Sequence, residues 1–186
     1  FYLTARTTQA LAALGAVELL RQKHPGLRLR VIALTAKDKI CFLEERECTP
    51  EACPYARGYY DRLRAGMWEA LDTYQLDRPA LEQLARRHRL CPFELGLDLS
   101  LWCDLIVGDY NYLFDPVVSL KRFFEGESQA LFLVDEAHNL PDRAREMYSA
   151  QLSLADLKEA KKALGRKKSR AKTALTKLGA RLEELT

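Results

Sequence analysis

One stretch decides the fold: Ala130-Leu131-Phe132-Leu133-Val134-Asp135-Glu136-Ala137-His138, in which an apolar run ends on acidic side chains. A short, continuous apolar run is typical of a parallel strand that is buried on both faces. The crevice that binds ligands in an open α/β sheet lies at the carboxyl ends of such strands. The stretch therefore predicts an α/β sheet with Asp135, Glu136 and His138 at a ligand site.

Three other segments have the same strand-like character. They are Phe1-Tyr2-Leu3, Arg30-Val31-Ile32-Ala33-Leu34 and Asp104-Leu105-Ile106-Val107-Gly108. Between the first two, apolar residues recur at helical spacing on one face, which consists of Leu11, Leu14, Val17, Leu19 and Leu20. Strands that alternate with a helix are typical of an α/β layer. Residues 1–37 and 99–141 are therefore predicted to be two parts of one sheet domain.

The composition changes between these two parts, in residues 38–98. This segment has no strand pattern, but it holds four of the five cysteines and two helical stretches, 56–74 and 78–88. An odd number of cysteines in a chain without a secretory signal argues against a disulfide framework, and clustered thiols in a reducing compartment more often bind metal. The segment is therefore predicted to be a helical, metal-binding insertion in the sheet domain.

The four cysteines of this insertion are Cys41, Cys48, Cys53 and Cys91, separated by six, four and thirty-seven residues. No pair has the Cys-x-x-Cys spacing that usually marks structural zinc, and thiolates on separate loops also suit a cubane iron-sulfur cluster. Spacing alone leaves both metals open, with four free buried cysteines as a third possibility. Cys103 lies in an apolar run before the next strand, so we expect it to be a free cysteine.

The side chains that follow the strand Leu131–Val134 suit nucleotide chemistry. An Asp there can hold Mg²⁺ through its water shell, the adjacent Glu can deprotonate an attacking water, and a His two residues on can sense a γ-phosphate. Asp135, Glu136 and His138 are therefore candidate catalytic residues. The alternative is an acidic helix start, because carboxylates favour the positive end of a helix dipole.

A second candidate site follows the first strand. Thr4, Arg6 and Thr7 offer hydroxyls and a guanidinium next to a helix N-terminus, which are groups that bind phosphates. The same segment could be an ordinary helix cap. Both interpretations stay open on the sequence alone.

The end of the chain, residues 142–186, is predicted to be helical, with apolar residues spaced by sevens and Gly165 able to break the helix into a hairpin. Within it, Lys158–Lys177 holds nine Lys or Arg against one Glu, although the whole chain carries only +3. This local charge could bind phosphates of a nucleic acid. The alternative is a solvated helical face.

The sequence also bears on location. No apolar run approaches the ~20 residues that span a bilayer, and the first residues lack the features of a signal peptide. We therefore expect a cytoplasmic protein, or a nuclear one in a eukaryote, with a bacterial origin favoured. The opening on an apolar run without an initiator Met predicts a piece of a longer protein.

Five segments, taken in order, carry a resemblance to a known family. They are Phe1-Tyr2-Leu3-Thr4-Ala5-Arg6-Thr7, Ile32-Ala33-Leu34-Thr35-Ala36-Lys37-Asp38-Lys39-Ile40-Cys41, Leu90-Cys91-Pro92-Phe93, Asp109-Tyr110-Asn111-Tyr112-Leu113-Phe114-Asp115-Pro116 and Val134-Asp135-Glu136-Ala137-His138. They resemble segments of the XPD and DinG families of superfamily 2 iron-sulfur DNA helicases. The first resembles the DNA-contacting motif Ia, the second the run before the first cluster ligand and the third the fourth-ligand segment. The fourth resembles a tyrosine-rich stretch and the fifth the Walker B (DEAH) box.

The resemblance implies a RecA-like motor domain that is interrupted by an iron-sulfur domain over 38–98 and followed by a helical Arch-like segment over 142–186. It implies that four residues hold a [4Fe-4S] cluster, namely Cys41, Cys48, Cys53 and Cys91. It further implies that Lys37 is the basic residue between cluster and DNA. We expect Tyr110 or Tyr112 to give aromatic support to the bound strand.

The resemblance also implies an ATP-dependent enzyme that unwinds duplex DNA in the 5′ to 3′ direction. Its cofactors would be Mg²⁺ and ATP, and its partners single-stranded DNA, duplex junctions and the remainder of the motor. The sequence contains no Gly-x-x-x-x-Gly-Lys-Ser/Thr loop, so the chain is expected to be an inactive component when alone. The alternative is a non-enzymatic nucleic-acid module that binds zinc or a cluster.

Overall fold

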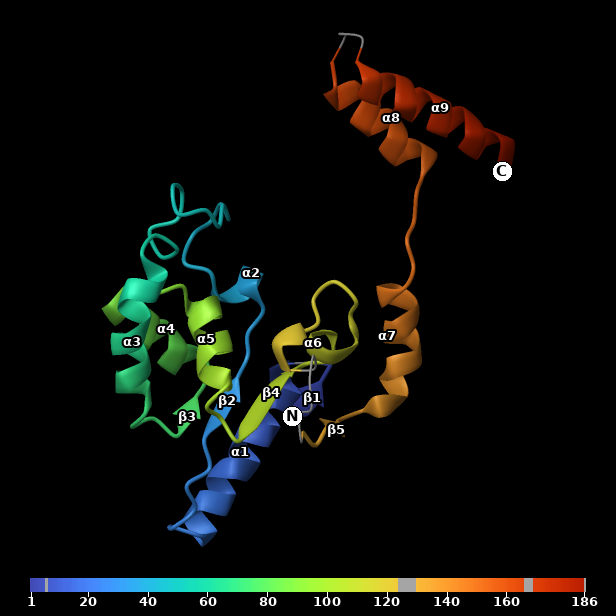
Figure 1. The fold of residues 1–186 in the computed structure, drawn as a ribbon. Helices are drawn as coiled ribbons and strands as arrows, with labels where there is room; N and C mark the ends of the chain where they lie inside the picture. Colours follow the sequence, from blue (N-terminus) through green and yellow to red (C-terminus); the bar gives the residue numbers. More distant parts are fainter. Residues whose placement is uncertain (6, 124–129, 166–168, 186) are drawn as a thin grey trace. The chain divides into compact units, whose positions relative to one another are not determined.

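The structure is a computed structural model that describes residues 1–5, 7–123, 130–165 and 169–185, drawn in Figure 1. The chain divides into two compact units, Phe1–Ala144 and Arg145–Thr186. The first contains the sheet and the second contains a pair of helices. The finer division predicted from the sequence, with boundaries after residues 37, 98 and 141, stays a prediction.

A parallel sheet forms the centre of the first unit. In the described residues its five strands are β1 (Tyr2–Thr4), β2 (Val31–Ala33), β3 (Gln75–Leu76), β4 (Leu105–Asp109) and β5 (Leu133–Val134). They lie in the order β3-β2-β4-β1-β5, and each neighbouring pair is parallel. The carboxyl ends of the strands therefore face one edge of the sheet. The predicted α/β fold is confirmed.

One helix, α1 (Thr7–Lys23), connects β1 to β2 and packs on the sheet. Its Leu14 and Val17 are buried against Val31 and Val107 of the central strands. The predicted apolar face was too wide, because three of its members are at least 46% exposed: Leu11, Leu19 and Leu20. The strands are only two to five residues long, whereas α1 has seventeen residues. The sheet can therefore cover only part of the helix, mainly its middle.

Helices fill most of the chain between β2 and β4: α2 (Lys37–Ile40), α3 (Tyr59–Ala70), α4 (Arg78–His88) and α5 (Pro92–Ser100). The bounds of α4 are those predicted, because Asp77 caps the helix by accepting a hydrogen bond from the Ala80 amide at 3.0 Å. α3 begins three residues later than predicted, after Gly58, whose φ is +60°. α5 was not predicted, although Pro92 suits the first position of a helix.

These helices share one hydrophobic core with the sheet. The core joins Ile32 and Ile106 from the strands to Leu81 and Leu84 of α4 and Leu95 of α5, all of them buried. Burial of side chains from both layers in one cluster stabilises the helices and the sheet together. The cysteine-bearing segment is therefore packed onto the sheet.

One strand in this segment contradicts the expectation that residues 38–98 contain no strand. Gln75 and Leu76 form β3, which pairs in parallel with Val31 and Ile32 of β2. Two residues are too few to show a period of two, and only Leu76 of the pair is buried, so the sequence carries little strand signal. The segment consists of two successive crossovers, from β2 to β3 and from β3 to β4.

A second correction concerns β5, which is shorter and more exposed than its apolar run predicts. The strand covers only Leu133 and Val134, and in the described part of the sheet it pairs with β1 alone. Leu131 is 85% exposed and Leu133 is 60% exposed. An outer strand has a neighbour on one side only, so the expected burial on both faces is wrong for the described chain.

Short elements complete the first unit: α6 (Asn111–Phe114), η1 (Lys121–Phe123) and η2 (Ala137–Asn139). α7 (Leu140–Met147) crosses the boundary between the units. α6 begins two residues after the end of β4 and η2 begins three residues after the end of β5, so both start near the carboxyl ends of these strands.

The second unit is a hairpin of α8 (Leu154–Ala163) and α9 (Arg170–Leu185), visible in Figure 1. Ser153 caps α8 by accepting a hydrogen bond from the Asp156 amide at 3.1 Å. Gly165 follows α8 with a φ of +67°, so the predicted break at this glycine is confirmed. None of the described helices is long and apolar enough to cross a membrane.

Replacing Gly66 with Ala should destabilise the first unit, because an added Cβ would lie 2.6 Å from Cδ1 of the fully buried Leu90. We expect the free energy of unfolding in urea to fall by about 1–3 kcal/mol, the usual cost of overpacking. The fluorescence of Trp68 and Trp102 would report the transition, since both lie in this unit.

Gly15→Ala is the matched control, since an added Cβ on this helical glycine would meet nothing within 4 Å in the described chain. It should raise the free energy of unfolding by ~0.5–1 kcal/mol, because Ala loses less backbone entropy than Gly in a helix. Equal stabilisation by both substitutions would contradict the close packing of Gly66.

Candidate functional site

The acidic pair of the DEAH stretch lies where the sheet presents its strand ends. The Asp135 amide donates a hydrogen bond to the Leu3 carbonyl at 2.9 Å, which continues the pairing of β5 with β1. On the other side of β1, Thr4 is in register with Asp109 at the end of β4. Three adjacent strands thus bring Thr4, Asp109 and Asp135 to the same edge.

Asp135 has a neighbour that the sequence analysis missed, the phenol of Tyr2. Burial, together with the charge of Asp135 and a hydrogen bond to it, raises the pKa of Tyr2. The phenol therefore keeps its proton and donates it toward the carboxylate. The register explains the contact, since Tyr2 is paired with Leu133 and Asp135 lies two residues further along the same face.

Glu136 adopts an unusual backbone conformation directly after the strand. Its φ is +52°, in the left-handed region that residues with a Cβ seldom occupy. The amide and the side-chain Nδ2 of Asn139 both donate to the Glu136 carbonyl, at 2.9 and 3.1 Å, and support this turn. The Glu136 carboxylate lies 3.2 Å from Nδ1 of His138, so the structure brings these two candidate residues together.

The two tyrosines expected to support DNA lie in the protein interior. Tyr110 is fully buried, and Tyr112 is 5% exposed and packs on Leu97 and Leu120. Burial, with a smaller effect of Asp109, raises the pKa of Tyr112 to about 12. The protein covers both rings, and aromatic support from these tyrosines stays a prediction. Burial depends on packing by distant segments, which the sequence pattern did not indicate.

The predicted phosphate group after β1 can be assessed only in part. Thr4 is buried, with 3% of its surface exposed, at the end of β1. Arg6 and the side chain of Thr7 lie outside what the structure describes. Phosphate binding by the hydroxyl and guanidinium groups of this segment therefore stays a prediction from the sequence.

Lys37 is the first residue of α2 and is held by an ion pair. Its Nζ lies 3.1 Å from Oε1 of Glu94 on α5 and 5.1 Å from the centre of the Phe93 ring. Partial burial works against the charged form, but the hydrogen bond and charge of Glu94, with smaller effects of Cys48 and Cys91, raise the pKa of Lys37. Sequence reasoning missed Glu94, because the two partners are 57 residues apart.

The four candidate ligands lie on separate segments of the first unit. Cys41 ends α2 and is half-buried, Cys48 is exposed, Cys53 is buried, and Cys91 is the residue that caps the start of α5. Among the described residues, no group of three or more Cys, His, Asp or Glu is close enough to hold a metal ion. The structure thus places the thiols around α2 and α5 without gathering them into one site.

Two cysteines differ in their electrostatic surroundings. Burial raises the pKa of Cys91, while the backbone amides of Glu94 and Phe93, and then Lys37, favour its thiolate. Burial raises the pKa of Cys103 to about 11, with a smaller contribution of Asp104, and its thiol donates to the Leu99 carbonyl at 3.4 Å. Cys91 thus has groups beside it that stabilise an anion, and Cys103 is held as a neutral thiol.

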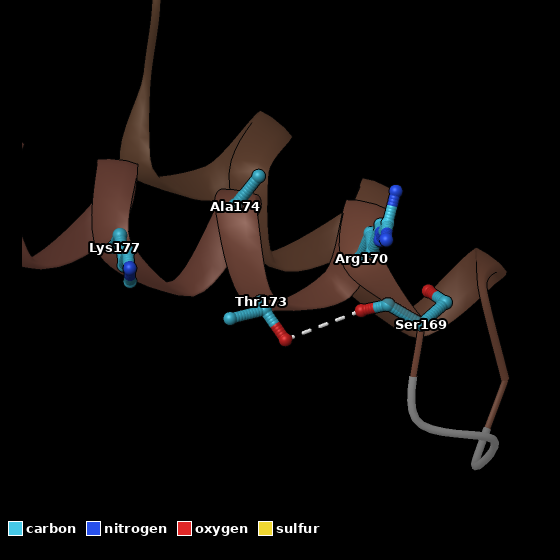
Figure 2. Close-up of a pocket in the computed structure, with 5 residues that line it drawn as sticks. All are labelled: Ser169, Arg170, Thr173, Ala174 and Lys177. Atoms are coloured by element: carbon cyan, nitrogen blue, oxygen red, sulfur yellow. Dashed lines mark hydrogen bonds between the residues drawn. The ribbon is translucent and has the colours of Figure 1, made fainter.

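The basic segment of the second unit lines an open depression on α9. Figure 2 shows the residues that form it: Ser169, Arg170, Thr173, Ala174 and Lys177. The Thr173 hydroxyl donates to the Ser169 carbonyl at 3.2 Å, so it serves the helix backbone. Residues 166–168, three of the basic residues of this segment, lie outside the described chain. Phosphate binding and a solvated helical face both stay open as interpretations of this segment.

Comparison with known proteins gives the chain a set of relatives. The Fanconi anemia group J protein homolog of Gallus gallus is 31% identical over 116 residues, which are 61% of this chain and 9% of that protein. The XPD/RAD3 helicase subunit of general transcription and DNA repair factor IIH from Saccharomyces cerevisiae is 24% identical over 63% of this chain and 15% of its own length. The chain thus spans a small part of these relatives.

A solved structure shares the fold. A truncated XPD superposes with a TM-score of 0.61 at 20% identity, over 98% of this chain and 52% of the other. The family model DEAD_2 matches residues 29–157, which include the four candidate ligands and the DEAH stretch. The resemblance to XPD-like helicases is thereby confirmed at the level of the family. The chain belongs to the DEAD_2 family.

Proposed function

We propose that this chain is part of an ATP-dependent DNA helicase that moves 5′ to 3′ and carries a [4Fe-4S] cluster. The observation that carries the proposal is the placement of Asp135 and Glu136 at the carboxyl end of a parallel strand, with Tyr2 beside Asp135. Membership of the DEAD_2 family supports it, as do relatives that are named as helicases.

Asp135 and Glu136 would divide the nucleotide chemistry between them. Mg²⁺ and ATP, when bound, supply a polarised γ-phosphate that water can attack. Asp135 would bind the metal's water shell, oriented by the Tyr2 phenol, and Glu136 would take the proton of the attacking water. His138, 3.2 Å from Glu136, would hold that carboxylate in place. The phosphate-binding loop is absent from this sequence, so the reaction requires the rest of a motor.

The cluster would be held by Cys41, Cys48, Cys53 and Cys91. Four thiols without a histidine are a donor set that suits iron and sulfide. When bound, the cluster would supply four bonds that tie together segments distant in sequence.

Single-stranded DNA would be bound through phosphates, by Lys37 and by the segment that holds Thr4, Arg6 and Thr7. Lys37 is 32% exposed and already carries a carboxylate partner, Glu94. A phosphate oxygen would compete with this carboxylate for the same ammonium group. We therefore propose that Glu94 pairs with Lys37 and orients it when no DNA is bound.

Each ligand cysteine replaced by Ser should lose the cluster, because three thiolates and a hydroxyl hold it poorly. The measurement is iron and acid-labile sulfide per chain after anaerobic purification, with the visible absorption of the cluster. Cys103→Ser is the matched control and should keep its iron, since that thiol is bonded to the Leu99 carbonyl.

An iron-free Cys103→Ser protein beside an iron-loaded Cys48→Ser protein would contradict the ligand assignment. Zinc in place of iron, with no visible absorption, would support the non-enzymatic nucleic-acid module instead.

Lys37→Ala should weaken binding of a short oligothymidine and lower the slope of log Kd against log salt by about 0.7, the value for one phosphate contact on a single strand. Glu94→Gln should instead tighten binding, by a factor of about 2–5, because it removes the competing partner of Lys37. Both effects are measurable by fluorescence anisotropy.

Glu82→Gln provides the control, since Glu82 forms a comparable pair with Arg78 on α4 at 2.6 Å. It should leave the affinity unchanged. Unchanged binding by Lys37→Ala at moderate salt would rule out Lys37 as a DNA contact.

In a full-length protein that contains this chain, Glu136→Gln should leave nucleotide binding largely intact and slow hydrolysis by roughly 10²-fold or more, as loss of a general base does. Asp135→Asn should also weaken Mg²⁺-dependent nucleotide binding. Tyr2→Phe should raise the Mg²⁺ concentration needed for half-maximal rate, because it removes the donor to Asp135.

The 186-residue chain alone should show no DNA-stimulated ATP hydrolysis. Turnover by this chain that Glu136→Gln abolishes would mean that it contains a complete nucleotide site, contrary to the proposal.

A further inference from the structure

The segment that carries three of the candidate ligands has no regular structure of its own. Residues 41–58, all of them described, form turns and bends but no helix or strand, and Figure 1 shows them as the loops between α2 and α3. Loops of this length need side-chain contacts to keep one conformation, because fixing each residue is entropically unfavourable. Arginines provide several of these contacts.

Arg57 holds the turn that leads into Cys53. Its Nε donates to the Pro50 carbonyl and its Nη2 to the Glu51 carbonyl, both at 3.0 Å. The Arg57 amide itself donates to the Cys53 carbonyl at 3.0 Å. One residue thus binds the chain on both sides of the Cys53 position, which fixes the direction of the turn.

Arg62 joins the Cys53 side to the Cys91 side. From α3, its Nη2 donates to the Arg57 carbonyl at 2.7 Å and to the Arg89 carbonyl at 2.9 Å, and its Nε donates to the same Arg89 carbonyl at 3.3 Å. Arg89 ends α4 with a φ of +52° and lies two residues before Cys91. A planar guanidinium with five donors can bridge two carbonyls in this way, whereas an ammonium has no fixed fork.

Arg86 holds the Cys41 side. Its guanidinium carbon lies 4.0 Å from the centre of the Phe42 ring, the residue after Cys41. The Phe42 ring in turn meets the ring of Tyr55 at 5.1 Å and 61°. Tyr55 lies two residues after Cys53, so this stack connects α4 to both ends of the loop.

Cys48 is outside this set of contacts. It is exposed, and none of the described hydrogen bonds and ring contacts of Arg57, Arg62 and Arg86 involves it. The arginine contacts are therefore distributed unequally among the four ligand segments. The segments of Cys41, Cys53 and Cys91 are tied to α3 and α4, and the Cys48 segment is tied only through its neighbours in the chain.

We infer that Arg57, Arg62 and Arg86 are positioning residues for the metal centre, which hold the segments of Cys41, Cys53 and Cys91 in place. The inference rests on the proposed function, since it takes the four cysteines to be ligands. Contacts that orient ligands affect how firmly a metal is held without touching it.

The test compares Arg62→Ala and Arg86→Ala with matched controls in the whole 186-residue protein, purified anaerobically. Arg64→Ala is the control for Arg62, because Arg64 is exposed on the same helix, and Arg87→Ala is the control for Arg86. Arg87 also links α4 to α3, through Glu69 at 2.6 Å, so it controls for the loss of any contact between these helices.

The measured quantities are the rate at which a ferrous chelator removes iron and the thermal midpoint of the metal-free protein. We expect Arg62→Ala and Arg86→Ala to lose iron about 10-fold faster than the unsubstituted protein, the lower end of effects seen for residues that orient ligands. The two control variants should lose iron at a rate within about twofold of that of the unsubstituted protein, because their side chains do not orient a ligand segment. The metal-free midpoints of all five proteins are compared so that iron loss caused by a general loss of stability can be corrected for.

Arg62→Lys separates positioning from charge, because it keeps the cation and loses the fork that bridges the two carbonyls. It should lose iron nearly as fast as Arg62→Ala. Unchanged iron loss in the two Ala variants would overturn the inference and leave the ligand assignment intact. A metal-free midpoint that falls in the same two variants, with iron loss no faster once corrected for unfolding, would make these arginines merely structural.

Failure of the proposed function has a different signature. If the unsubstituted protein holds neither iron nor zinc, the ligand assignment is wrong, and so is the inference that depends on it. If the protein holds zinc, the same five proteins and a zinc indicator test the positioning role directly, with the same expected order of release rates.

Discussion

Backbone pairing between β2 and β4 is the constraint on which the rest of the first unit depends. These neighbouring parallel strands are joined in sequence by the whole cysteine-bearing segment, which must leave β2 and return to β4 beside it. β3 divides that path by pairing with the other side of β2. Three cysteines then fall on the first crossover and Cys91 on the second. The pairing of β3 and β4 on either side of β2 thus determines which crossover carries each of the candidate ligands.

The parallel arrangement also sets the distance between the two candidate sites. Asp135 follows β5 and Lys37 follows β2, so both lie at the carboxyl edge of the sheet. β4 and β1 separate these strands, which corresponds to three strand spacings or about 14 Å. Nucleotide chemistry at one site and phosphate binding at the other would thus share a rigid support. Movement of one site relative to the other would require the sheet itself to shear, which its packed core opposes.

Local signals predicted much of this unit, and non-local packing accounts for what they missed. α4 has the predicted bounds, and the structure shows why the helix begins there, because Asp77 caps it and Pro79 lies in its first turn. β3 was missed because two residues carry no period. The ion pair of Lys37 with Glu94 joins residues 57 apart, and no pattern in a window of sequence connects them. The candidate ligands and the acidic pair were proposed from residue type, spacing and the family resemblance, whereas their surroundings depend on which segments the sheet brings together.

The helices between β2 and β4 are linked to one another and to η1 by hydrogen bonds as well as by apolar contacts. The Tyr59 hydroxyl of α3 donates to Asp98 of α5 at 2.8 Å, and Arg122 of η1 donates to the other oxygen of Asp98 at 3.1 Å. This chain of hydrogen bonds runs from the start of α3 to the segment that follows α6. Metal binding at the cysteines would contribute folding free energy to everything that shares their core, which includes Ile32 of β2 and Ile106 of β4. β5 lies beyond β1 and outside that core, so the proposed cluster would stabilise the sheet without contacting the residues proposed for nucleotide chemistry after β5.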